Sequence, residues 1–199
     1  YANTTDNVAA DNLLSGTNLS VSIAAADIAK PEEWVVDRVL GAVRRSLDRG
    51  AQVIVLPCNT ASVTALPHVR ELVGPGVPVI GTVPAIKPAA AACDSVAIWA
   101  TAATTASRYQ ADLIEQFGNG AKVVGVPCHG LADSIDLGDR AAALAAIESA
   151  VARTPDDVNG VVLGCTHYPL LTGVLSYVMG DGVTLVSSAE ETAKDVYRT

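Results

Sequence analysis

Short apolar runs that read as strands alternate with helix-like segments along most of this chain, and this alternation limits the fold more than any other feature. The runs QVIVLP (52–57), AKVVGVP (121–127) and VNGVVLG (158–164) are continuous in apolar residues and do not alternate with polar ones. Continuous apolar strands that alternate with helices are typical of a mainly parallel sheet with both faces covered. The sequence therefore predicts an α/β fold.

The expected elements follow from spacing, propensity and breakers. Helices are predicted from residue 31 to a stop at Gly50 and over about 61–73, 84–92, 104–117, 139–153, 169–178 and 189–198. Strands are predicted over 52–57, 77–83, 95–99, 121–127, 158–164 and 182–188. Residues 1–20, rich in Asn, Thr, Asp and Ser, are expected to be irregular.

Composition and charge exclude several classes of protein. Half of the 199 residues are hydrophobic and 17% are charged, so a substantial core can form. No apolar run approaches 18 residues, so we expect no membrane span, and the polar first twenty residues do not resemble a signal peptide. The net charge of −8 disfavours nucleic acid as a partner. Four cysteines without a CxxC pair favour reduced thiols in a cytoplasmic protein.

Three predicted strands end in cysteine, and ligands of open α/β sheets bind at the carboxyl ends of strands. VIVLPCNT places Cys58, Asn59 and Thr60 there, VVGVPCHG places Cys128 and His129, and VVLGCTH places Cys165, Thr166 and His167. The first and third share one order, a strand, a cysteine and two hydrogen-bonding residues. This repeat suits equivalent positions in two α/β halves.

The chemical interpretation is a pair of thiols that face one ligand. A thiolate is stabilised by a helix N-terminus or an adjacent positive histidine. Asn59, Thr60 and Thr166 offer side chains and backbone N–H groups to carboxylate oxygens. Two opposed acid–base groups could remove a proton from one face of a carbon and return it on the other.

Plainer interpretations compete with this one. Cysteine after a buried strand is often only packing, which we expect for Cys93 and Cys128. A zinc site from Cys58, Cys128, Cys165, His129 and His167 would have none of the usual short zinc spacings, so no metal is expected. His68 is expected to be solvated on a helix face, and Trp34 and Trp99 to be core residues. No P-loop or GxGxxG sequence indicates a nucleotide.

Three motifs resemble the glutamate racemases of the aspartate/glutamate racemase superfamily. They are CNTAS (58–62), GCTHYPLL (164–171) and SSAEETA (187–193), and the similarity runs from about residue 30 to residue 199. The resemblance implies cofactor-independent interconversion of L- and D-glutamate, which supplies D-glutamate for peptidoglycan.

The resemblance also implies roles for individual residues. Cys58 and Cys165 would act on opposite faces of the α-carbon, and His167 would assist Cys165. The implied substrate-binding residues are Asn59, Thr60, Thr104 and Thr166. Asp136 falls near a family glutamate that supports catalysis.

The same resemblance predicts two lobes with the active site in the cleft between them. Lobe one would hold residues 1–86, with 188–199 returning to it, and lobe two would hold 87–187. The expected partner is a small-molecule substrate, glutamate, and a homodimer is left open.

The sequence also departs from the family pattern. It shows neither the DSG turn nor the PYG loop, nor the last strand and helix beyond SSAEETA. AAADIA (24–29) is interpreted as a remnant of the strand before the PYG loop, with Asp27 as a loose match to the family. Two alternatives therefore stay open: a racemase of aspartate or a related acid, and an inactive homologue that acts as a binding protein. Aspartate-type members usually carry an acidic residue where His167 stands, which favours glutamate.

Overall fold

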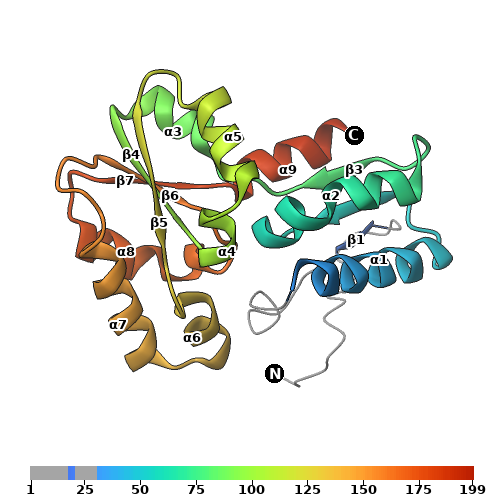
Figure 1. The fold of residues 1–199 in the computed structure, drawn as a ribbon, viewed down its shortest axis with the longest axis horizontal. Helices are drawn as coiled ribbons and strands as arrows, with labels where there is room; N and C mark the ends of the chain where they lie inside the picture. Colours follow the sequence, from blue (N-terminus) through green and yellow to red (C-terminus); the bar gives the residue numbers. More distant parts are fainter. Residues whose placement is uncertain (1–17, 21–30) are drawn as a thin grey trace. The chain divides into compact units, whose positions relative to one another are not determined.

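The computed structural model describes residues 18–20 and 31–199, so Asp27 lies outside the described residues (Figure 1). The described chain divides into two compact units. The first comprises the described residues up to Thr82 together with Thr192–Thr199, and the second comprises Val83–Glu191. The predicted α/β class is confirmed, because each unit is built on a parallel sheet with helices packed against it.

The first unit holds a three-stranded parallel sheet in the order β1-β2-β3. The strands are β1 (Asn18–Ser20), β2 (Val53–Leu56) and β3 (Val79–Gly81), and the helices are α1 (Glu32–Asp48) and α2 (Asn59–Val73). The apolar residues of α1 recur at helical spacing and pack against the central strand and α2. This core contains Val35, Val39, Val43, Ile54, Leu56, Ala61, Ala65 and Val69.

The second unit holds a four-stranded parallel sheet in the order β5-β4-β6-β7. Its strands are β4 (Ser95–Ala100), β5 (Lys122–Pro127), β6 (Gly160–Leu163) and β7 (Thr184–Ser187). Its helices are α3 (Ile86–Ala92), α4 (Ala102–Thr105), α5 (Arg108–Phe117), α6 (Leu131–Leu137), α7 (Arg140–Val151) and α8 (Thr172–Met179), with a 3₁₀ turn at Tyr168–Leu171. The last helix, α9 (Ala189–Arg198), begins in the second unit and ends in the first.

All six residues of β4 are buried, because this strand has helices on both faces. Side chains alternate between faces along a strand. Val96, Ile98 and Ala100 pack in a cluster with residues of α3 and α5. Trp99 points to the opposite face, where its indole N–H donates to Thr154 Oγ1, just after α7, at 2.9 Å. In Figure 1, α3 and α5 lie together at the top of this unit and α7 lies at the bottom.

Several local expectations differ from the structure. A short strand, β1, stands within the stretch expected to be irregular, and α6 was not predicted. The helix predicted over 104–117 is divided into α4 and α5. Ser107 causes this division, since its Oγ accepts a hydrogen bond from Gln110 N at 3.1 Å and so starts a new helix.

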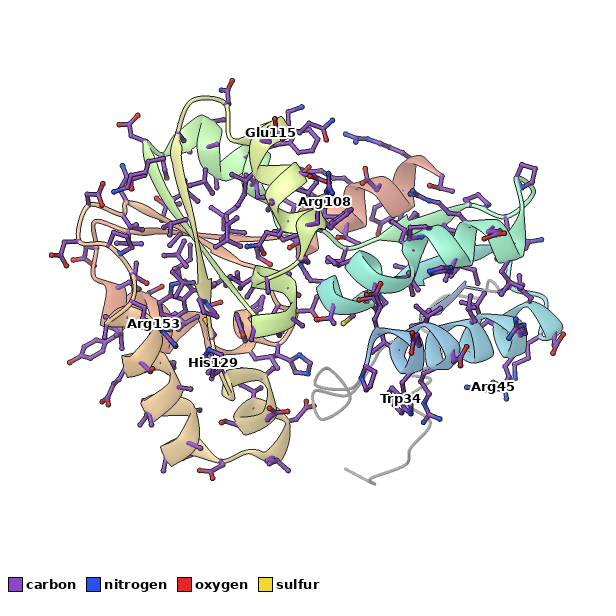
Figure 2. The ribbon with its side chains drawn as sticks, in the orientation of Figure 1. Trp34, Arg45, Arg108, Glu115, His129 and Arg153 are labelled. Carbon is purple, nitrogen blue, oxygen red and sulfur yellow. The ribbon has the colours of Figure 1, made fainter. Side chains whose placement is uncertain are left out.

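The two tryptophans differ in burial. Trp99 is fully buried, as predicted, but the prediction that Trp34 is a core residue is wrong, because its side chain is 38% exposed. Trp34 lies in the first turn of α1 and projects from that helix (Figure 2), where the Arg38 guanidinium lies 6.0 Å from its ring centre. His68 is exposed on α2, as predicted. None of the described helices is long and apolar enough to cross a membrane.

Cys93 has a packing role, as its position suggested. It is 7% exposed, and its thiol donates to the carbonyl oxygen of Asn159 at 3.5 Å. This contact brings Cys93 against Gly160, at the start of β6. A Cβ at position 160 would stand 2.7 Å from Cys93 Sγ and 2.9 Å from its Cβ.

We therefore predict that Gly160→Ala lowers the free energy of unfolding by about 1–3 kcal/mol, because the added methyl group overpacks the core. Gly173→Ala in α8 is the matched control, since nothing lies within 4 Å of a Cβ there. The control should leave stability unchanged or slightly raised. Urea unfolding measures both, and a Gly160→Ala variant as stable as the parent protein would contradict the packing described.

Candidate active site

Cys58 stands two residues after the end of β2 and caps the N-terminus of α2. Its side chain is 4% exposed, and its sulfur accepts a hydrogen bond from the backbone N–H of Ala61 at 3.5 Å. A backbone N–H and the positive end of a fifteen-residue helix both favour the thiolate over the thiol. The structure therefore gives Cys58 surroundings that suit a proton acceptor.

Asn59 and Thr60 form the first turn of α2 beside Cys58, and both are buried. The side-chain amide of Asn59 has no hydrogen-bond partner for either its oxygen or its nitrogen among the described residues. An unpaired buried amide is destabilising unless something else satisfies it. Asn59 thus has the free donor and acceptor that a polar ligand needs.

Cys165 stands two residues after the end of β6. The chain reaches it through Gly164, where a Cβ would lie 2.9 Å from the Trp99 carbonyl oxygen and 3.1 Å from Ala100 Cβ. Only glycine permits this close approach to β4, and the approach sets the path of the loop that carries Cys165. The thiol is 5% exposed.

Cys165, His167 and Asp136 form a hydrogen-bonded series. Cys165 Sγ lies 3.5 Å from His167 Nδ1, and His167 Nε2 lies 2.9 Å from Asp136 Oδ1 on α6. A carboxylate can only accept, so Nε2 donates and Nδ1 of the neutral ring is left as the acceptor for the thiol proton. This order, a nucleophile, a base and a group that orients the base, is how histidine activates a thiol.

Thr104 and Thr166 belong to the same edge of the second sheet. Thr104 is in α4, directly after β4, and its hydroxyl accepts from Thr101 Oγ1 at 3.0 Å. Thr166 follows Cys165 and is exposed. A cavity of about 110 Å³ adjoins this edge, and its lining includes Cys165 and Thr166.

The predicted site residues thus fall into two groups, one in each unit. Cys58, Asn59 and Thr60 lie together in the first unit, and Cys165, Thr166, His167 and Thr104 follow neighbouring strands of the sheet in the second. The contact from Asp136 to His167 could not be read from the residues themselves, because α6 has no clear signal in the sequence. The position of Asp136 came only from the loose family match.

Cys128 differs from the other two strand-end cysteines. It is 2% exposed, and its thiol donates to the Val126 carbonyl oxygen at 3.5 Å. Burial is the largest influence and raises the pKa of Cys128 to about 12, although a hydrogen bond with Tyr168 and the charge of Arg153 act the other way. A zinc ligand must be a thiolate, so this environment favours packing.

His129 is exposed next to Cys128 (Figure 2). Among residues 18–20 and 31–199, no group of three or more His, Cys, Asp or Glu side chains could hold a metal ion.

Cys128 should resist alkylation in the native protein. Because the pKa of its thiol is raised to about 12 from an ordinary 9.0, we predict almost no iodoacetamide modification of folded Cys128 at pH 8 to 9. In urea the pKa returns toward 9.0, and Cys128 should react over this same pH range. Peptide mass spectrometry measures the labelling, and equal rates in folded and unfolded protein would refute the burial effect.

The chain is similar to known proteins of one family. A family model described as Asp/Glu/Hydantoin racemase matches residues 6–196. The chain is 43% identical over 171 residues to a glutamate racemase of Parafrankia sp. (strain EAN1pec), a match that covers 80% of this chain and 59% of the relative. It is 34% identical over 177 residues to a glutamate racemase of Ectopseudomonas mendocina, covering 85% and 66%. The chain thus spans about three-fifths of the length of these relatives.

Solved structures give the same assignment. An Escherichia coli glutamate racemase, in complex with L-glutamate and the activator UDP-MurNAc-ala, matches with a TM-score of 0.77 and 31% identity over 90% of this chain and 71% of that one. An aspartate racemase of Picrophilus torridus, at 16% identity and a TM-score of 0.60 over 82% of this chain and 68% of that one, shares the fold. With the motifs, the two parallel sheets and these matches together, the chain belongs to the Asp/Glu/Hydantoin racemase family.

Proposed function

We propose that this protein is a glutamate racemase that interconverts L- and D-glutamate without a cofactor, using Cys58 and Cys165 as its two acid–base groups. The observation that carries the proposal is the series Cys165, His167 and Asp136, which supplies a thiol with a base and that base with an orienting carboxylate. Cys58 has a different activating environment at the start of α2. The glutamate racemase relatives and the glutamate-bound Escherichia coli structure support the choice of substrate.

The proposed reaction moves one proton off the α-carbon and another onto it. In one direction the Cys58 thiolate takes the α-proton, and the electron pair of the C–H bond passes to the carbon and its carboxylate. The Cys165 thiol then donates its proton to the opposite face, which inverts the centre and leaves Cys165 as thiolate. The reverse reaction exchanges the two roles, and His167 Nδ1 can accept the proton of Cys165 to prepare it as the base.

The remaining polar residues are proposed to hold the substrate. Asn59, Thr60, Thr104 and Thr166 would bind its carboxylate and ammonium groups, and the unpaired amide of Asn59 is the clearest support for this role. We further propose that lobe one (1–86 with 188–199) and lobe two (87–187) each supply one of the two thiols that act on the substrate. The product would supply D-glutamate for peptidoglycan in the cytoplasm.

Two alternatives stand beside this proposal: an inactive homologue that binds a ligand or partner, and a racemase of a related acid. The fold shared with an aspartate racemase admits a related acid as substrate. His167 in contact with Asp136, where aspartate-type members usually have an acid, favours glutamate.

Deuterium exchange tests the activity directly. With L-glutamate in deuterated water, the protein should place deuterium at the α-carbon and form D-glutamate, as measured by NMR and chiral chromatography. Cys58→Ser and Cys165→Ser should each lower the racemisation rate by at least about 10²-fold, because each removes a proton-transfer group. Cys93→Ala, far along the chain from either motif, is the control and should retain activity. Protein that is folded and shows no α-exchange would exclude this function.

Asp136→Asn tests the orienting carboxylate. It removes the charge that holds the His167 tautomer, so the rate should fall on the order of 10²-fold. Since the enantiomers are equal in energy, kcat/KM must fall equally in both directions. The primary deuterium isotope effect should rise only for the enantiomer whose α-proton Cys165 removes.

Asp133→Asn, which removes the same charge from the same helix, is the matched control for this variant. It should leave the rate and both isotope effects unchanged. Isotope effects that stay at their original values in Asp136→Asn, despite a lower rate, would place Asp136 outside the proton-transfer step.

A further inference from the structure

Ser188 has a buried hydroxyl that nothing in the described structure satisfies. The residue stands between β7 and α9, is 5% exposed, and its Oγ has no hydrogen-bond partner among the described residues. Its position suggests a helix cap. However, its Oγ makes no capping bond. The neighbouring Ser187 Oγ instead accepts from Ala189 N, the first residue of α9, at 3.2 Å.

An unpaired hydroxyl in this position calls for an explanation. A buried polar group without a partner is destabilising, and native proteins pair most of them with protein, water or ligand. Alanine at position 188 would remove this buried, unpaired hydroxyl and would break no hydrogen bond among the described residues. The hydroxyl is therefore better explained by a ligand than by the fold.

The surroundings of Ser188 indicate which ligand. Ser188 lines the cavity of about 110 Å³ that Cys165 and Thr166 also line. The remaining lining residues are Leu163, Pro169, Ser187 and Ala189. The pairing of β6 with β7, with Leu163 opposite Ser187, brings the residues that follow these two strands side by side. Ser188 and Cys165 thus line one small cavity, and a group bound in it would lie beside both residues.

The charge of this end of the cavity favours a carboxylate over an ammonium group. Ala189 begins α9, a ten-residue helix, so the positive end of the helix adjoins the cavity. Glu190 and Glu191 in the first turn of α9 oppose this potential, but both side chains are exposed to water, which screens them. A hydroxyl donor beside a helix N-terminus suits an anion.

We propose that the Ser188 hydroxyl donates a hydrogen bond to the α-carboxylate of the amino-acid substrate when the α-carbon lies at Cys165. This inference rests on the proposed racemase function and names a substrate ligand outside the CNT and CTH motifs. The α-carboxylate is the substrate carboxylate bonded to the α-carbon, so it is the one expected nearest to the thiol. As the α-proton leaves, negative charge spreads onto this carboxylate, and a fixed donor stabilises it most at that stage.

The test compares Ser188→Ala with Ser188→Thr and with Ser46→Ala. Ser46 is an equally buried serine on α1, but its hydroxyl donates to the Ala42 carbonyl oxygen at 3.0 Å. Ser188→Ala should lower kcat/KM for α-deuterium exchange by about 10- to 100-fold, mostly through kcat. Ser188→Thr keeps the hydroxyl and should retain most of the rate, and Ser46→Ala should keep it all.

Thermal unfolding distinguishes a ligand-binding role of Ser188 from a purely structural role. Ser188→Ala should have the same melting temperature as the parent or a higher one, whereas Ser46→Ala loses a satisfied hydrogen bond and should melt lower. A Ser188→Ala variant that exchanges at the parental rate would overturn the inference and leave the racemase proposal intact. The inference also fails if Ser188→Ala and Ser188→Thr both melt well below the parent.

A binding measurement separates the two proposals if the protein shows no exchange. Glutamate should then still protect Cys165 from iodoacetamide, and Ser188→Ala should need at least tenfold more glutamate for equal protection. That result would support the Ser188 contact and reject the racemase activity. Absence of both exchange and protection in the parent protein would reject both.

Discussion

The parallel pairing of β4 with both β5 and β6 is the constraint on which the candidate site of the second unit depends. Parallel strands end at the same edge, so the segments that follow these three strands are neighbours although they lie far apart in sequence. At that edge lie Thr104 after β4, Cys128 after β5, and Cys165 with His167 after β6. Gly164 makes the arrangement tight, because only a residue without a side chain fits against the Trp99 carbonyl oxygen.

The cysteines at the strand ends differ in the groups that their thiols contact. Cys128 and Cys165 are almost equally inaccessible, so exposure alone does not separate them. Their hydrogen-bond partners do. Cys128 meets a backbone carbonyl oxygen, which favours its protonated form, whereas Cys165 meets an imidazole nitrogen that can take its proton. A strand-end cysteine becomes a candidate for catalysis when its neighbours favour the thiolate, as His167 does for Cys165 and the Ala61 N–H does for Cys58.

The sequence was informative where one local pattern decides the structure. Continuous apolar runs predicted the strands, and the repeated order of strand, cysteine and polar pair pointed to Cys58 and Cys165.

The sequence was less informative where tertiary contacts decide the structure. Trp34 looked like core, but the buried face of α1 is set by Val35 and Val39, which leaves the tryptophan outside. The helix α6, which delivers Asp136 to His167, is short and has no side-chain cap. Ser188 stands where a helix cap is expected, and only the structure shows that its hydroxyl makes no capping bond.

The hydrogen bond from Ala61 N to Cys58 has a consequence for how the protein tolerates change. At Cys165 the support comes from side chains, so a single substitution at His167 or Asp136 can remove it. At Cys58 it comes from the main chain, which is present whatever residue occupies position 61, provided that it is not proline. The surroundings of the two cysteines would therefore differ in how many substitutions they tolerate. Variation among homologous chains should be tolerated around the first cysteine wherever the helix still starts there, and should be restricted around the second to residues that keep its base in place.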